Sequence, residues 1–147
     1  MKVRLHPRAI ALGLLVDFGG TLLAAVVLVA LTGLLAGAVG AVRGVTPDLD
    51  RLPRSPWFVA QTIVVGTGFS LLGGYVAGRG SPGAERLNGA VFAALTVSLS
   101  LALPAGDPPL PPAWVDVLSV ALCLAAACGG AELARRERRA GPREEAP

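Results

Sequence analysis

The sequence predicts an all-α integral membrane protein, a four-helix transmembrane bundle with both termini in the cytoplasm. Three observations carry this prediction. Hydrophobic residues make up 53% of the 147 residues and charged residues only 16%, whereas soluble domains carry roughly 25% charged residues. The apolar residues gather in four long runs, and the stretches between them hold nearly all of the charge and most of the proline. This distribution excludes a disordered chain and argues against a water-soluble enzyme.

The first apolar run covers about 9–42 and is interrupted only by Asp17. As a single helix it would measure roughly 51 Å, which exceeds the ~30 Å hydrocarbon core of a bilayer. We therefore expect this helix to tilt, to project beyond the bilayer, or to break near Gly33, Gly37 and Gly40. Basic residues precede it as in a signal peptide, but no cleavage site follows, so we expect the helix to be retained.

The other apolar runs predict helices at about 57–78, 87–103 and 114–134. Each has the length of a single span, and backbone groups in lipid are satisfied internally only by a helix or a closed barrel. The connections contain prolines and glycines that end helices. We expect 1–134 to form one transmembrane domain, followed at 135–147 by a charged cytoplasmic tail that is disordered at its end.

The basic residues predict the orientation of the bundle. Four spans place both termini and the second loop on one side, where ten basic residues lie, against three on the other side. Because cytoplasmic segments carry the excess of Lys and Arg, we expect both termini in the cytoplasm. Trp57 and Trp114 begin runs on the predicted outer face, where an aromatic belt is expected. The excess of Arg over Lys, with much Ala, Gly and Pro, is typical of a GC-rich bacterium, so we expect its inner membrane.

Small residues recur at helical spacing along the predicted helices. Lipid supplies no hydrophobic drive between helices, so close backbone approach through small faces becomes important. Packing inside one four-helix bundle and a seam between copies of the chain both explain the pattern. The residues that we single out for helix packing are Gly33, Gly37, Gly66, Ser70, Gly74 and Gly78.

Asp17 is the one acidic residue inside the first apolar run. A carboxylate that faces lipid unpaired costs roughly 2.5 kcal/mol or more, so Asp17 is expected to face the bundle interior, to be paired or to be protonated. Such residues are functional candidates, although an ion pair or hydrogen bond that fixes helix packing near the cytoplasmic face also explains Asp17. The predicted site is a cytoplasmic-side polar cluster of Asp17, Tyr75, Arg79, Asn88 and Glu132.

Other residues give no support for catalysis or cofactor binding. His6 is the only histidine, which argues against a histidine-based zinc site or a Ser-His-Asp site. Cys123 and Cys128 lie five residues apart, on different faces of a helix, and suggest no redox pair or metal set. We therefore expect no enzyme activity, no metal, no cofactor and no nucleic-acid partner. The expected partner is the lipid bilayer, together with a second copy or another membrane protein.

Three short segments, together with the overall pattern of the chain, resemble known proteins. Val16-Asp17-Phe18-Gly19-Gly20-Thr21, together with Gly73-Gly74-Tyr75-Val76-Ala77-Gly78-Arg79 and Asn88-Gly89, is similar to segments of small, uncharacterised four-helix membrane proteins of bacteria. This resemblance covers most of the chain. It implies the fold and no particular activity.

Asp17, Gly20 and Thr21 also resemble a motif in the first helix of the small multidrug resistance family, which are four-helix, proton-coupled exporters. The family has Glu where this chain has Asp17, and that acid binds protons and a cationic substrate in turn. The resemblance implies this role for Asp17 alone. The chain departs from the family in its long first loop, its charged tail and the absence of the family's substrate-lining aromatic residues.

These observations favour a small, non-enzymatic, multi-pass inner-membrane protein that acts through structure or partner interaction, with homo-oligomerisation left open. The alternative is a small proton-coupled transporter that uses Asp17 as its coupling carboxylate. A transporter requires that Asp17 be titratable and accessible along a hydrated path. A structural bundle requires that Asp17 be fixed to a partner such as Arg79 or Asn88.

Overall fold

The computed structural model describes residues 4–44, 55–102 and 113–140, and it confirms the all-α, four-helix class. The first helix consists of α1 (Pro7–Leu14), the π-helical turn η1 (Leu15–Gly19) and α2 (Gly20–Arg43). The remaining helices are α3 (Pro56–Arg79), α4 (Glu85–Ala102) and α5 (Ala113–Ala140). Every element in the described residues is helical, as expected for a chain whose backbone has to satisfy itself in lipid.

The first helix runs without a break for 37 residues, from Pro7 to Arg43. Of the three alternatives for this long helix, a break near Gly33, Gly37 and Gly40 is therefore wrong. These glycines lie inside regular α2, and the helix ends only where Gly44 takes a left-handed backbone conformation, with φ of 63°. The irregularity falls instead at η1, which contains Asp17. A π-helical turn widens the helix by one residue and is common at functional sites.

Local signals at the helix ends agree with the predicted boundaries to within a few residues. Ser55 caps α3 through its hydroxyl, which accepts a hydrogen bond from the Phe58 amide at 3.2 Å, and Pro56 occupies the first turn. Proline there costs nothing, since that amide has no helical partner. The largest difference is in α5, which continues to Ala140 beyond the predicted boundary at 134. The rest of the predicted tail, 141–147, lies outside the described residues.

Three of the helices are long and apolar enough to cross a membrane: Pro7–Arg43, Pro56–Arg79 and the part of α5 that begins at Trp114. The helix α4 is the exception among the four. It is shorter, and its first turn carries Glu85 and Arg86. Length and hydropathy thus support a membrane location. Which end of the molecule faces the cytoplasm stays a prediction.

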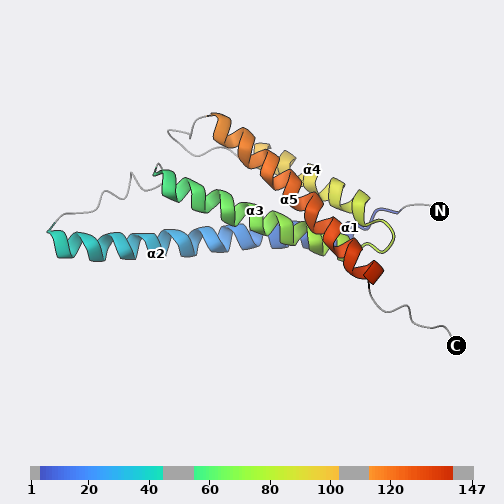
Figure 1. Cartoon of the computed structure of the whole chain (residues 1–147), viewed down its shortest axis with the longest axis horizontal. Helices are drawn as coiled ribbons and strands as arrows, with labels where there is room; N and C mark the ends of the chain where they lie inside the picture. Colours follow the sequence, from blue (N-terminus) through green and yellow to red (C-terminus); the bar gives the residue numbers. More distant parts are fainter. Residues whose placement is uncertain (1–3, 45–54, 103–112, 141–147) are drawn as a thin grey trace.

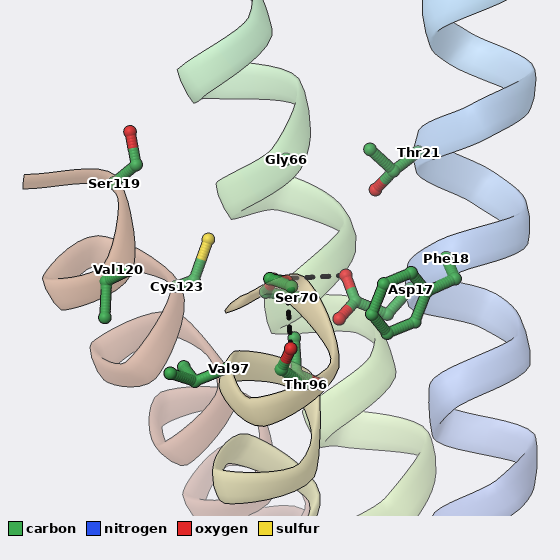
Figure 2. A pocket seen from close by; sticks show the side chains of 11 residues that line it. Asp17, Phe18, Thr21, Gly66, Ser70, Thr96, Val97, Ser119, Val120 and Cys123 are labelled. Carbon is green, nitrogen blue, oxygen red and sulfur yellow. Dashed lines mark hydrogen bonds between the residues drawn. The ribbon is translucent and has the colours of Figure 1, made fainter. Parts of the chain in front are cut away.

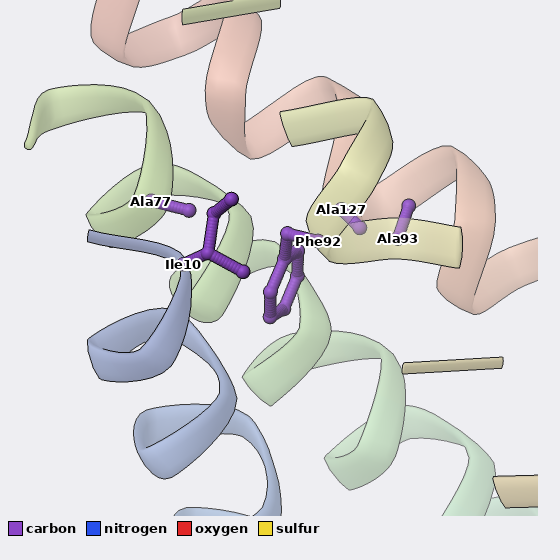
Figure 3. Packing of buried hydrophobic residues seen from close by; sticks show 5 residues of the cluster. All are labelled: Ile10, Ala77, Phe92, Ala93 and Ala127. Carbon is purple, nitrogen blue, oxygen red and sulfur yellow. The ribbon is translucent and has the colours of Figure 1, made fainter. Parts of the chain in front are cut away.

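The four helices converge at one end of the molecule and spread apart toward the other (Figure 1). We call the region where α1, the end of α3, the start of α4 and the end of α5 meet the packed end. A small apolar core fills it, formed by Ile10, Ala77, Phe92, Ala93 and Ala127 (Figure 3). Phe92 and Ala77 are fully buried. This core fixes the relative positions of all four helices.

Close backbone contact between α3 and α5 accounts for much of the packing at this end. A Cβ atom added to Gly74 would collide with the backbone of Ala127, and one added to Gly78 would collide with that of Ala131. Gly130 of α5 approaches the backbone of Leu71 in the same way. Glycine is required at these positions because no side chain fits between the two backbones.

The opposite end, which we call the open end, consists mainly of α2 and the first half of α3. The only buried residue of α2 is Gly40. No residue in the most apolar window of the first helix is buried inside the molecule. Added Cβ atoms at Gly33, Gly37 and Gly66 would meet nothing within 4 Å. Half of the small residues singled out from the sequence thus have no packing partner within the described chain, in contrast to Ser70, Gly74 and Gly78.

Candidate functional site

Asp17 lies on the inner side of the π-helical turn η1 and is only 4% exposed. The Ser70 hydroxyl of α3 donates a hydrogen bond to Asp17 Oδ1 at 3.1 Å (Figure 2). Asp17 Oδ2 is also buried, but it has no hydrogen-bond partner among the described residues. The carboxylate is therefore half satisfied, which is unusual because buried polar atoms are nearly always hydrogen-bonded.

A cavity of about 180 Å³ adjoins the Asp17 carboxylate. Its volume is several times the ~30 Å³ that one water molecule occupies. All four helices contribute to its wall, and its polar side chains are Asp17, Thr21, Ser70, Thr96, Ser100 and Ser119. Figure 2 shows Ser70 and Thr96 beside Asp17, and Ser119 and Cys123 farther away on α5. We call this space the Asp17 cavity.

The hydroxyl groups of the Asp17 cavity are mostly arranged as acceptors. Ser70 gives its hydrogen to Asp17, and Ser100 gives its hydrogen to the Thr96 carbonyl at 2.9 Å. A hydroxyl has one hydrogen and two lone pairs. Each of these oxygens is left with lone pairs, while Asp17 Oδ2 and the buried Thr96 Oγ1 make no hydrogen bond among the described residues. The cavity wall is therefore rich in oxygen acceptors.

The predicted polar cluster does not form as one group, because the structure separates Asp17 from the residues at the packed end. Tyr75 and Arg79 do come together: the Arg79 guanidinium donates to the Tyr75 hydroxyl, which donates to Glu137, both at 2.6 Å. Asn88 is fully buried elsewhere, where its Oδ1 accepts from the His6 amide at 2.8 Å. The sequence-based alternative that fixes Asp17 to Arg79 or Asn88 is thus wrong, since Ser70 is the partner.

Glu132 forms a separate ion-pair group with three arginines of α4 and α5. Arg86 Nε lies 2.9 Å from Glu132 Oε2, and Arg135 and Arg136 lie 3.2 and 3.6 Å from its carboxylate oxygens. Arg86 and Arg135 also donate hydrogen bonds to this carboxylate. Glu132 begins the charged segment 132–140, beyond the apolar part of α5, and serves there as an anchor for basic side chains.

Glu85 is a second acidic anchor at the packed end, and sequence reasoning missed it. Its side chain is buried at the start of α4, where it accepts from the Gly83 amide at 3.0 Å and faces Arg138 Nε at 3.3 Å. Burial raises the pKa of Glu85, but backbone hydrogen bonds and the charges of Arg138 and Arg135 outweigh burial and lower the pKa overall. Arg138 also donates to the Arg79 carbonyl at 2.6 Å, so it joins α3, α4 and α5.

Position along the helices explains why Ser70 and Thr96, rather than Arg79, lie near Asp17. Asp17 follows Arg8 by nine residues, Ser70 precedes Arg79 by nine, and Thr96 follows Arg86 by ten. If these arginines mark one membrane surface, all three polar side chains lie at a similar depth of roughly 14 Å. On the same assumption Arg79 lies at the surface, nine residues along α3 from Ser70, and is too far along the axis to reach Asp17.

No group of three or more potential metal-ligating His, Cys, Asp or Glu residues occurs in the part of the chain that the structure describes. No family model, no curated protein and no solved structure matches the chain. The two resemblances drawn from the sequence therefore remain predictions. The all-α fold, with three helices long and apolar enough to cross a membrane, has the features of a multi-pass helical membrane protein.

Proposed function

We propose that this chain is a non-enzymatic membrane protein that acts by association within the bilayer, and that α2 pairs with α2 of a second copy. The observation that carries the proposal is the uncovered state of α2, whose only buried residue is Gly40. Gly33 and Gly37 lie one turn apart on this helix, with open space where side chains would be. A pair of glycines at this spacing lets two helices approach closely enough for van der Waals packing to hold them together.

The contrast with the packed end supports this proposal. There, Gly74, Gly78 and Gly130 are covered by the backbones of neighbouring helices. Glycine costs about 1 kcal/mol relative to alanine in a helix. Gly33 and Gly37 bring that cost to α2 without any contact within the described chain, and a second copy supplies the missing contact. A twofold pair of identical helices places the same glycines opposite each other.

The test is the dimer affinity of the full-length protein in lipid vesicles, measured by single-molecule photobleaching at a series of protein densities. The double variant Gly33→Ile/Gly37→Ile is expected to raise the dimer Kd at least about tenfold, which corresponds to about 1.4 kcal/mol. Ala38→Ile places one isoleucine on another exposed face of α2 and is expected to leave the Kd unchanged. A wild-type protein that stays monomeric at every density contradicts the proposal.

A second candidate function is ion-coupled transport with Asp17 as the proton-binding carboxylate, and one observation favours it. Asp17 Oδ2 is buried without a hydrogen-bond partner among the described residues and adjoins a cavity. An acidic residue fixed only for packing would use both oxygens. Intramembrane acids that face a cavity are typical of proton relays and transport pathways.

The transport candidate is tested by proton release in detergent on addition of tetraphenylphosphonium, a lipophilic cation. The wild-type protein is expected to release up to one proton per chain, and Asp17→Asn none. The Asn variant is expected to fold, because its amide oxygen still accepts from Ser70. Unchanged pH in the wild-type sample, together with a folded Asn variant, would reject transport of such cations while leaving the association proposal intact.

A further inference from the structure

We infer that the Asp17 cavity binds one small monovalent cation, of the sodium type, through oxygen atoms of Asp17, Ser70 and Thr96. The inference uses the same cavity as the transport candidate and names the class of ion that occupies it beside the proton. It requires only binding, not transport. The argument rests on the charge of the cavity wall, on its hydrogen-bonding state and on its size.

The single negative charge of the cavity wall matches a ligand with a single positive charge. Asp17 is the only acidic side chain in the wall, and no basic side chain lines the cavity among the described residues. Asp17 is 4% exposed, so water outside the protein does little to solvate its charge. An unneutralised carboxylate at membrane depth costs roughly 2.5–3.5 kcal/mol. One monovalent cation removes this cost, whereas a divalent ion would leave an excess of charge.

The hydrogen-bonding state leaves several oxygen atoms beside Asp17 with lone pairs that can bind a cation. Asp17 Oδ2 and Thr96 Oγ1 are buried and make no hydrogen bonds among the described residues. Ser70 has already donated its hydrogen to Asp17 Oδ1, so its oxygen offers lone pairs only. Carboxylate and hydroxyl oxygens are hard ligands that suit alkali ions, whereas soft metals prefer thiolate or imidazole. The one sulfur in the wall, that of Cys123, lies away from Asp17 (Figure 2).

The size and position of the cavity fit an ion that keeps part of its water. A volume of about 180 Å³ holds the ion and a few water molecules that complete its coordination. The three proposed ligands come from three different helices, η1 of the first helix, α3 and α4. A cation bound between them draws these helices together just beyond the apolar core. Binding is therefore expected to stabilise the fold as well as to fill the site.

The experiment compares thermal unfolding of the full-length protein in nanodiscs of neutral lipid, in sodium, potassium or ammonium chloride, against N-methylglucamine chloride of equal strength. We expect at least one small cation to raise the wild-type Tm by roughly 5 °C or more at saturation. The cation with the largest effect identifies the source, and binding of radioactive sodium measures the stoichiometry, expected to be one per chain. Equal Tm values in all four salts would overturn the inference.

Two variants localise the effect, and one matched control guards against a general change in stability. Asp17→Asn keeps the acceptor for Ser70 and is expected to abolish the cation-dependent shift. Thr96→Val keeps the side-chain shape and is expected to weaken cation affinity about tenfold. Thr62→Val makes the same substitution at an exposed site of α3 outside the cavity and is expected to retain the full shift. A cation-dependent rise in Tm that persists in Asp17→Asn would overturn the proposed site, whatever the result for Thr96→Val.

The outcomes separate this inference from the transport candidate. Cation binding without proton release on addition of tetraphenylphosphonium supports the cation site and rejects export of that ligand. Proton release without any cation-dependent shift supports a carboxyl group that serves protons alone and overturns the cation site. A Tm that depends on pH but not on the cation would likewise overturn the cation site.

Discussion

The packed end and the open end of this molecule use the same kinds of residues for different purposes. At the packed end, glycines of α3 and α5 touch neighbouring backbones, and Phe92 fills the space between four helices. At the open end, glycines of α2 and α3 face open space. A small residue at helical spacing therefore indicates packing only where another helix is present. At the packed end the partner helix belongs to the same chain, and at the open end we propose that it belongs to a second copy.

The two ends also differ in how polar residues are satisfied. Arginines and glutamates at the packed end form ion pairs and hydrogen bonds that join the helix ends, as Arg138 does between α3 and α4. Asp17, which lies between the two ends, is paired through one oxygen only. The molecule thus combines a fixed end with an incompletely satisfied middle and an uncovered end. We expect the packed end to contribute most of the free energy of unfolding. Binding is expected at Asp17 and at the open end.

The largest effect on stability is expected from Gly74→Val, which introduces a branched side chain where α3 touches the backbone of Ala127. Neither backbone can move without separating the two helices, so we expect a loss of about 3 kcal/mol or more. The matched control is Gly68→Val on the same helix, where an added Cβ meets nothing within 4 Å and which lies outside the wall of the Asp17 cavity. Reversible unfolding in mixed micelles measures both variants. Equal destabilisation by the two would remove the distinction between the ends.

A smaller effect is expected from Phe92→Ala, which empties the centre of the apolar core. In water such a truncation costs about 3–5 kcal/mol. In lipid the unfolded reference is itself apolar, so only lost packing contributes, and we expect about 1–3 kcal/mol. Leu101 on the same helix is 75% exposed, and Leu101→Ala is expected to change the unfolding free energy by less than about 0.5 kcal/mol. A cost for Phe92→Ala near zero would show that the core does not hold the packed end.

The sequence was sufficient for the helices and insufficient for their contacts. Apolar runs and flanking prolines predict each helix, because length and hydropathy alone decide whether a segment can satisfy its backbone in lipid. The π-helical turn at Asp17 could not be predicted, since one extra residue in a helix leaves no compositional mark. Nor does spacing distinguish Gly74, which is covered, from Gly66, which is not. That difference depends on how the helices cross.

Asp17 is buried, as expected from the sequence, but the residues predicted to lie beside it do not lie there. Asp17 stands out because a carboxylate in an apolar run is costly. Charge complementarity suggested Arg79 as the partner of Asp17. The contact is instead determined by position along the helices, and Ser70 lies at the level of Asp17. Hydroxyl residues such as Thr96 give a weak signal in sequence, because membrane helices often satisfy them on their own backbone, as Ser100 and Ser119 do.

The pH dependence of the packed end is expected to follow Glu85, whose pKa is lowered in the folded protein from its ordinary value of 4.5. A lowered folded-state pKa means that the stabilisation is present above 4.5 and is lost as the pH falls through the folded-state value. Glu85→Gln keeps an acceptor for the Gly83 amide but loses the charge that faces Arg138. We expect it to cost about 1 kcal/mol at pH 7.

Unfolding of wild type and Glu85→Gln at a series of pH values measures this effect. The two proteins are expected to converge in stability as the pH falls below 4.5, because the wild-type carboxylate becomes protonated. The difference between the two proteins is the informative quantity, because the other acidic groups are the same in both. A difference that stays constant with pH would mean that Glu85 acts through packing rather than through charge.

The smallest effect is expected from Tyr75→Phe, which removes the hydroxyl between Arg79 and Glu137. Both hydrogen bonds measure 2.6 Å, but all three groups are exposed to solvent. Exposed charged contacts are screened and typically contribute less than about 1 kcal/mol, so we expect a loss of about 0.5 kcal/mol. High salt is expected to reduce this difference further. If Tyr75→Phe instead costs as much as Phe92→Ala, polar contacts between helix ends, rather than apolar and backbone packing, would be what closes the packed end.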